Sequence, residues 1–191
     1  MPLRYREERG QALVEFALLF PFVLLIIVVI VEFSFVWNSR NTVAFASRDG
    51  SMFAAEGGSL PGTDCLVLDR IERNIVSPAR AIRVQEVRIY WSDRNGSQIG
   101  SFMNVYDRSG GFTTCDFDGS TFIVPYTLTT AGYPETTRCD VLAGCGGAHT
   151  GVDTIGVRIT YQHFWLTSFA RLIGSGVTFE ETTATRVEPQ L

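Results

Sequence analysis

The sequence places a glycine and an acidic residue five positions apart near the amino terminus, Gly10 and Glu15. Gly10 precedes a long apolar segment, and Glu15 lies at its start, where a carboxylate in apolar surroundings needs a partner. If the chain is cut after Gly10, Gln11 gains a free ammonium group that could neutralise the Glu15 carboxylate of another subunit. The other interpretation is that Glu15 marks the water interface of the segment.

Four cysteines could form two disulfides in an oxidising compartment: Cys65, Cys115, Cys139 and Cys145. Three pairings are possible. Cys139 and Cys145 are six positions apart among glycines, which favours a local loop and leaves Cys65 for Cys115. Pairing of Cys115 with Cys139 is the alternative. A zinc site is not expected, because the chain has no Cys-x-x-Cys element.

The other reactive residue types do not favour an enzyme. All 16 basic residues are arginine, which excludes Schiff-base and P-loop chemistry because both need lysine. His149 and His163 are isolated, and we expect surface or partly buried imidazoles. Asp116 and Asp118 look like the start of a calcium loop, but the later ligands are missing, so we expect a solvated turn. We predict no catalytic residue, cofactor or metal.

Composition narrows the function classes further. The chain has 191 residues, 46% hydrophobic and 19% charged, which argues against disorder. Its net charge of −4 provides no basic field for nucleic acid, so that class of partner is excluded.

The element that carries Glu15 is a predicted membrane helix. Residues 16–31 contain no charge and span about 24 Å at about 1.5 Å per residue, which is marginal for a hydrocarbon core of about 30 Å. A helix over residues 16–37 spans about 33 Å, with Glu32 near one interface and Trp37 as an interfacial anchor. We therefore expect one transmembrane helix at about residues 16–37, with the lipid bilayer as its first partner.

Arginines before this helix predict its orientation. Arg4, Arg6 and Arg9 favour a cytoplasmic amino terminus and an extracytoplasmic head in a single-pass inner-membrane protein. A removed signal peptide is the alternative, but its cleavage pattern Ala44-Phe45-Ala46 lies 15 positions after Val31, too far downstream.

Two stretches carry a family resemblance. The first reads Arg9-Gly10-Gln11-Ala12-Leu13-Val14-Glu15-Phe16-Ala17-Leu18-Leu19-Phe20-Pro21, and Val31-Glu32-Phe33 closes the apolar run. The second reads Asn41-Thr42-Val43-Ala44-Phe45-Ala46-Ser47-Arg48-Asp49-Gly50-Ser51-Met52-Phe53-Ala54-Ala55. Over residues 9–55, about a quarter of the chain, the sequence resembles TadE-like minor pseudopilins of the tight-adherence (Flp-type) pilus systems. Weaker similarity lies in Val157-Arg158-Ile159-Thr160-Tyr161 and Arg186-Val187-Glu188-Pro189.

The resemblance implies a processing site. A prepilin peptidase would cut after Gly10 on the cytoplasmic side, between Gly10 and Gln11, and the helix would remain on the mature protein. Glu15, followed by Phe16, would be needed for processing or subunit packing, and Pro21 would kink the helix. Gln11 is larger than the residue often found after the cut, which would slow cleavage. The implied partners are the peptidase, other pilins or pseudopilins and inner-membrane assembly components.

The expected fold is α+β: a long helix that continues into a small, mostly antiparallel head, as in pilins. We expect a leader at residues 1–10, a long helix at 11–57 and a head at 58–191. In the helix, a seven-residue spacing predicts a buried stripe on the protein's own sheet or on a neighbouring subunit. Its members are Phe45, Ala46, Met52 and Phe53.

Periodicity also predicts the elements of the head. A short helix is expected from Asp64 to Val76, capped by Thr63 or Asp64. Alternation with period two predicts strands around residues 87–91, 122–128, 155–162 and 177–187. Asn95-Gly96 indicates a hairpin, and Pro125 favours an edge strand.

Three functions remain open at this point: a membrane-held minor pseudopilin, an anchored extracytoplasmic binding module with an uncleaved helix, and an anchored enzyme. The first is favoured by the spacing of Gly10 and Glu15. The second predicts an intact amino terminus, and the third predicts a pocket of clustered polar residues.

Overall fold

The structure, a computed structural model, describes residues 4–140, 145, 151–168, 170–172 and 174–187. The helices are α1 (Arg4–Gly57) and α2 (Thr63–Asn74), with short 3-10 turns η1 (Ala81–Arg83), η2 (Glu135–Thr137) and η3 (Ala170–Leu172). The strands are β1 (Val84–Ser92), β2 (Gln98–Asp107), β3 (Thr113–Phe117), β4 (Ser120–Val124), β5 (Thr127–Ala131), β6 (Thr154–Phe164) and β7 (Gly176–Arg186).

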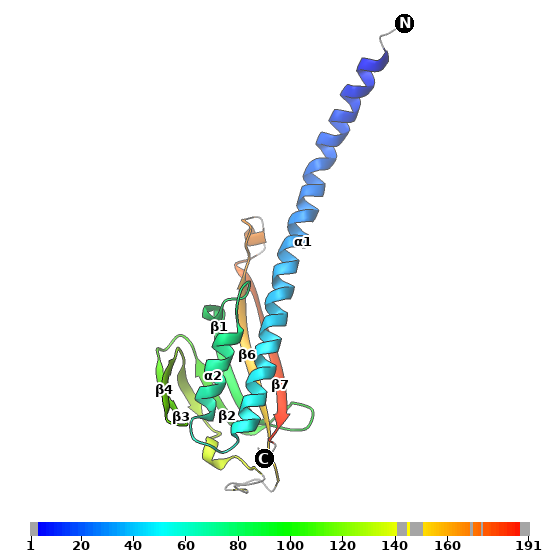
Figure 1. Cartoon of the computed structure of the whole chain (residues 1–191). Coiled ribbons are helices and arrows are strands. Elements are labelled where there is room, and N and C mark those ends of the chain that lie inside the picture. Colours follow the sequence, from blue (N-terminus) through cyan, green and yellow to red (C-terminus); the bar gives the residue numbers. More distant parts are fainter. Residues whose placement is uncertain (1–3, 141–144, 146–150, 169, 173, 188–191) are drawn as a thin grey trace.

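Helix α1 is a rod of 54 residues, about 80 Å long at about 1.5 Å per residue. Its amino-terminal half stands clear of the rest of the chain, and its carboxyl-terminal half lies along the sheet beside α2 (Figure 1). The predicted α+β class, with a long helix continuing into an antiparallel head, is confirmed. The division of the chain at residues 10 and 57 into leader, helix and head stays a prediction.

Five strands form the main sheet in the order β5-β2-β1-β6-β7, and each neighbouring pair is antiparallel. Alternate side chains of the central strands β1 and β6 point to the helices and form the core, among them Val87, Ile89, Val157 and Ile159. The predicted hairpin is present: β1 and β2 join across a turn in which Gly96 has a φ of 84°.

The strand predicted through residues 122–128 is wrong. Pro125 has no N–H for a ladder, and the chain turns there instead of continuing. Strand β4 before it pairs with β3 in a separate two-stranded sheet, whereas β5 after it pairs with β2 at the edge of the main sheet.

The predicted apolar stripe of α1 is buried on the protein's own head at only two of its four positions, and its packing on a neighbouring subunit stays a prediction. Phe45 is 60% exposed and Met52 is 45% exposed, although Ala46 is fully buried and Phe53 packs against the core. The buried face consists mainly of small residues: Ser39, Val43, Ala46, Ser47, Gly50, Ser51 and Ala54. Small side chains let the helix axis approach the sheet and α2 closely, so the large apolar residues next to them point outward.

Helix α2 begins at Thr63, and its capping differs from the prediction. Gly62 occupies the cap position with a φ of 86°, and the Thr63 hydroxyl donates backward to the Leu60 carbonyl. The cap is supplied by Glu135, whose carboxylate accepts from the backbone N–H groups of Gly62 at 2.7 Å and Asp64 at 2.6 Å. A carboxylate there satisfies two free N–H groups and complements the helix dipole.

Candidate functional site

The amino-terminal part of α1 presents apolar side chains on all sides. Leu13, Phe16, Phe22 and Ile30 are each more than half exposed. Within the described part of the chain, α1 is the one helix long and apolar enough to cross a membrane, and none of its most apolar window is buried against the head. Since exposed apolar side chains on every face favour lipid over water, this segment is a membrane anchor.

Gly10 has no structural reason to be glycine within the folded chain. It lies inside α1, where glycine costs about 1 kcal/mol relative to alanine, and a Cβ atom built on it would meet nothing within 4 Å. The absence of a side chain is therefore not required by packing in the described structure.

Glu15 lies one turn after Gln11 on the exposed helix. The Gln11 amide Nε2 donates to Glu15 Oε1 at 3.1 Å, so these two predicted site residues are brought together on one face. The next residue, Phe16, stacks its ring on Phe20 with centroids 5.5 Å apart. All the predicted processing residues lie within helix α1. The helix also continues past Pro21, where the kink stays a prediction.

Glu32 is the acidic residue at the other end of the apolar run, and sequence reasoning missed its partners. It is only 4% exposed. Its carboxylate accepts from the backbone N–H groups of Leu166 at 3.2 Å and Thr167 at 2.5 Å, in the connection between β6 and β7. This connection therefore folds back against α1 at the point where the charge-free segment ends, as the orange hairpin tip in Figure 1 shows.

Hydroxyl groups fasten α1 to the sheet below this point. Ser47 donates to the Val157 carbonyl at 2.8 Å, and the hydroxyls of Ser51 and Thr185 are 2.8 Å apart. Ser39 Oγ lies 3.2 Å from Nδ1 of His163. These contacts join the helix to β6 and β7 directly below the membrane segment.

His163 is fully buried beside α1, so the expected surface or partly buried imidazole is wrong for this residue. Its other ring nitrogen has no hydrogen-bond partner among the described residues. Burial, assisted by the Arg83 guanidinium, lowers its pKa below the ordinary value, and Glu32 partly offsets this. His149 lies outside the described residues.

Both disulfides have the pairing that the spacing favoured. Cys65 in α2 is bonded to Cys115 in β3, and Cys139 is bonded to Cys145. The first bridge ties the small β3–β4 sheet to the main body. The turn expected around Asp116 and Asp118 is present between β3 and β4, with Thr121 donating to Asp116 Oδ1 and Asp118 at a φ of 47°.

A buried polar cluster closes the end of the head that lies away from the free half of α1. Asp64 accepts from Asn104 Nδ2 and Tyr106 OH at 2.8 Å each and pairs with the fully buried Arg138. Burial, together with the Asp64 charge, raises the pKa of Tyr106. Burial raises the pKa of Glu135 too, although the two N–H groups oppose it. Because its groups bond to one another, the cluster serves to fix the fold.

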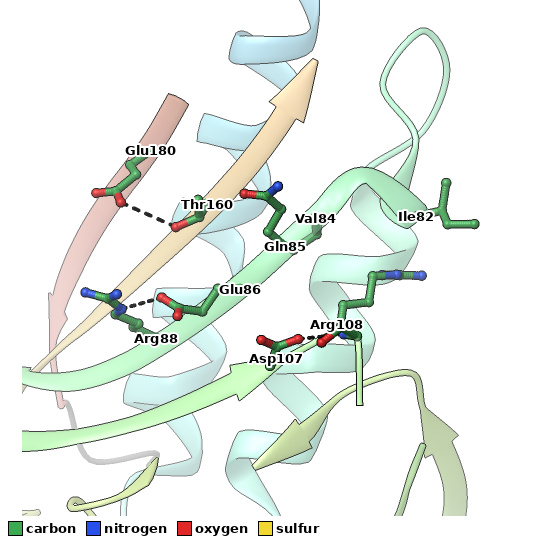
Figure 2. Close-up of a pocket in the computed structure, with 10 residues that line it drawn as sticks. Ile82, Val84, Gln85, Glu86, Arg88, Asp107, Arg108, Thr160 and Glu180 are labelled. Carbon is green, nitrogen blue, oxygen red and sulfur yellow. Dashed lines mark hydrogen bonds and ion pairs between the residues drawn. The ribbon is translucent and has the colours of Figure 1, made fainter. Parts of the chain in front are cut away.

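The open face of the sheet carries a shallow groove of about 630 Å³, drawn in Figure 2. Its charged side chains are largely satisfied by each other: Glu86 pairs with Arg88, and Thr160 donates to Glu180 at 3.5 Å. Such a surface offers hydrogen-bond donors and acceptors to a ligand.

Comparison with known proteins adds one match. Residues 10–52 match the family model described as TadE-like protein. The matched segment runs from the candidate cleavage glycine to the small-residue face of α1, and it confirms the resemblance found over residues 9–55. No curated protein and no solved structure matches the chain. The family match supports a membrane protein associated with the tight-adherence pilus.

Proposed function

We propose that this TadE-like chain is a minor pseudopilin that a prepilin peptidase processes after Gly10 and that takes part in assembly of a tight-adherence-type pilus. It would be inserted in the inner membrane with its amino terminus in the cytoplasm and its head outside. The proposal gives the chain no catalytic role and no cofactor.

The observation that carries this proposal is Gly10, an exposed helical glycine with open space around it, five positions before Glu15. A peptidase must reach the peptide backbone on either side of the bond that it cuts, and an unbranched position gives that access. Because no packing contact in the described chain explains the glycine, recognition by another protein explains it better than folding does.

Processing would also change the charge at the helix start. The cut removes the arginine-rich leader and leaves an ammonium group on Gln11, which lies on the same helix face as Glu15. In the membrane, that ammonium group could neutralise the Glu15 carboxylate of an adjacent subunit, since a carboxylate in hydrocarbon requires a partner. Lateral helix packing and ATPase-driven extraction through other inner-membrane components would then follow.

The test is the intact mass of the chain extracted from membranes of cells that contain the peptidase. A start at Gln11 with the helix retained is expected. Gly10→Val should leave the start at Met1, because a branched side chain blocks access to the bond. Ala17→Val adds the same type of side chain within the membrane segment and should leave cleavage unchanged. A wild-type chain that starts at Met1 would contradict cleavage after Gly10.

The groove on the open sheet face favours a second candidate, an anchored extracytoplasmic binding module. In that function the leader stays attached and the head acts as a monomer. The same mass measurement separates the two candidates, because only the binding module keeps Met1 in cells with an active peptidase.

A further inference from the structure

We propose that the tip of the head inserts into the interface of the lipid bilayer beside α1, as a second membrane contact. The tip is defined as Phe164, Trp165 and Leu166, at the end of β6 and the start of the connection to β7. This inference rests on the membrane anchoring of α1 proposed above and adds to it a contact made by the head itself.

The first argument is the level at which the tip is held. Glu32 follows the last residue of the charge-free run and accepts the Leu166 and Thr167 N–H groups. The tip is therefore fixed within one helical turn of the end of the apolar segment. Two hydrogen bonds from backbone groups to a buried carboxylate prevent the connection from swinging away from the helix.

The second argument compares lengths. Residues 16–31 span about 24 Å, which is shorter than a hydrocarbon core of about 30 Å. If the core begins at residue 16, about four residues after Val31 also lie in the hydrocarbon, and the tip lies just inside its edge. If Glu15 is instead paired within the membrane, residues 12–31 span about 30 Å and the hydrocarbon ends directly before Glu32. The first placement puts the tip just inside the hydrocarbon and the second puts it at the hydrocarbon edge, so both bring it into contact with lipid.

The third argument is the chemistry of the exposed side chains. Leu166 is 50% exposed and Phe164 is 39% exposed, and no residue in the described part of the chain covers them further. On the helix, Phe33 and Trp37 are exposed at the same level, with ring centroids 6.3 Å apart. Tryptophan is enriched at membrane interfaces, and segments that lie in the interface combine tryptophan, phenylalanine and leucine with nearby cations. Arg83 supplies that cation, 5.4 Å from the centroid of the Phe164 ring.

Lipid is the occupant that these observations favour, because the apolar tip is continuous with the lipid-facing surface of α1. Two attachment points fix the tilt of the head on the membrane, and both must be released before the chain can leave the bilayer.

Quenching by brominated lipid tests the proposal in the full chain. The chain is reconstituted in vesicles of phosphatidylcholine and phosphatidylglycerol, with or without bromine on the upper part of the acyl chains. Trp37→Phe, Trp91→Phe and Trp165→Phe remove the native tryptophans, and one tryptophan is then placed by Leu166→Trp. Phe22→Trp in the helix is the positive control, and Phe112→Trp, at a side chain 77% exposed on the head, is the matched negative control.

We expect brominated lipid to reduce the Leu166→Trp emission at least twofold, with no change for Phe112→Trp. Repeating the comparison with native Trp165 as the sole tryptophan avoids a new side chain at position 166. Intact mass that shows both disulfides checks folding of each variant.

Two results would overturn the inference. In the first, brominated lipid quenches Phe22→Trp but leaves Leu166→Trp unquenched, like Phe112→Trp. The membrane anchor is then supported and the tip contact is refuted. In the second, the Leu166→Trp emission is shielded from aqueous iodide but is not quenched by brominated lipid. The tip is then covered by a protein partner and not by lipid. If Phe22→Trp is also unquenched, the membrane anchor itself fails, so the two proposals fail separately.

Discussion

His163 and Glu32 lie at successive levels of the contact between the head and α1. Glu32 meets the β6–β7 connection, and His163 meets Ser39 seven residues further along the helix. Both are buried polar groups in the contact between α1 and the head, near the end of the membrane segment. The protonation state of His163 therefore bears directly on how firmly the head holds its helix.

Acidification below about pH 6.5 should weaken the head. Burial lowers the His163 pKa in the folded chain below its ordinary value of 6.5, so the fold prefers the neutral ring. The stability that results is complete above pH 6.5 and is lost as the pH falls through the lower folded pKa, because the unfolded chain then binds the extra proton. The free energy of unfolding, measured in detergent between pH 7.5 and 5, should decrease.

His163→Asn is the control for this decrease, since its amide can replace the ring nitrogen that faces Ser39 but does not titrate. The raised pKa of Glu135 acts in the opposite direction. A carboxyl whose pKa is higher in the folded chain increases the free energy of unfolding as the pH falls. The difference between wild type and His163→Asn therefore isolates the histidine. An identical pH slope in both chains would contradict the assignment.

At the scale of elements, the close packing of α1 depends on residues that have almost no side chain. Ala46 is fully buried against the core, whereas its neighbour Phe45 is 60% exposed. Ala46→Leu should destabilise the head by about 1–3 kcal/mol, because the added carbons push the helix off the sheet. A drop in the thermal unfolding midpoint in detergent would report it.

Phe45→Ala is the matched control, one position away on the outward face. It should change the free energy of unfolding by less than about 0.5 kcal/mol, as is usual for exposed positions. If Phe45→Ala were the more destabilising of the two, Phe45 rather than Ala46 would face the head, which would contradict the observed packing of α1.

The exposure of Phe45 beside the buried Ala46 shows which structural features periodicity predicts and which it does not. Alternation along β1 and β6 predicts those strands correctly because each buries one face in a single sheet, and the two cysteines at a spacing of six predict a local bridge. Size does not predict which face of a helix is buried when the neighbouring surface is unknown. The spacing of large apolar residues in α1 therefore places Ala46 and Phe53 correctly against the core, but not Phe45 and Met52.

The missed contacts of the candidate site have a common cause, which is distance along the chain. Glu32 is satisfied by backbone groups 134 and 135 positions away. Helix α2 is capped by Glu135, 71 positions after Asp64. Gly10, Gln11 and Glu15 could be identified from sequence because their relation is local. A partner brought in by the fold leaves no signal in the spacing of nearby residues.

At the scale of the whole molecule, the chain has three mechanical parts: the rod of α1, the five-stranded head, and the small sheet of β3 and β4. Two-stranded sheets are marginally stable alone. The small sheet is joined to α2 by the Cys65–Cys115 disulfide, which closes a loop of 50 residues and crosses from one part to another. The Cys139–Cys145 bridge closes a loop of only six.

Loss of the long-range bridge should therefore cost more than loss of the local one. On the loop-entropy estimate, replacing Cys65 and Cys115 by serine lowers the free energy of unfolding by about 4 kcal/mol, and the same change at Cys139 and Cys145 lowers it by about 2 kcal/mol. Denaturant unfolding of both double variants in detergent, with wild type alongside, measures the difference.

Hydrogen exchange separates the mechanical role of the bridge from a general loss of stability. In the chain without Cys65 and Cys115, the amides of β3 and β4 should exchange faster than those of β1 and β6, because the small sheet loses its tie while the central strands keep both neighbours. The chain without Cys139 and Cys145 should retain protection in β3 and β4. Equal acceleration throughout the head in the first variant would mean that the small sheet and the main sheet unfold as one unit, and that the disulfide joins parts already held together by packing.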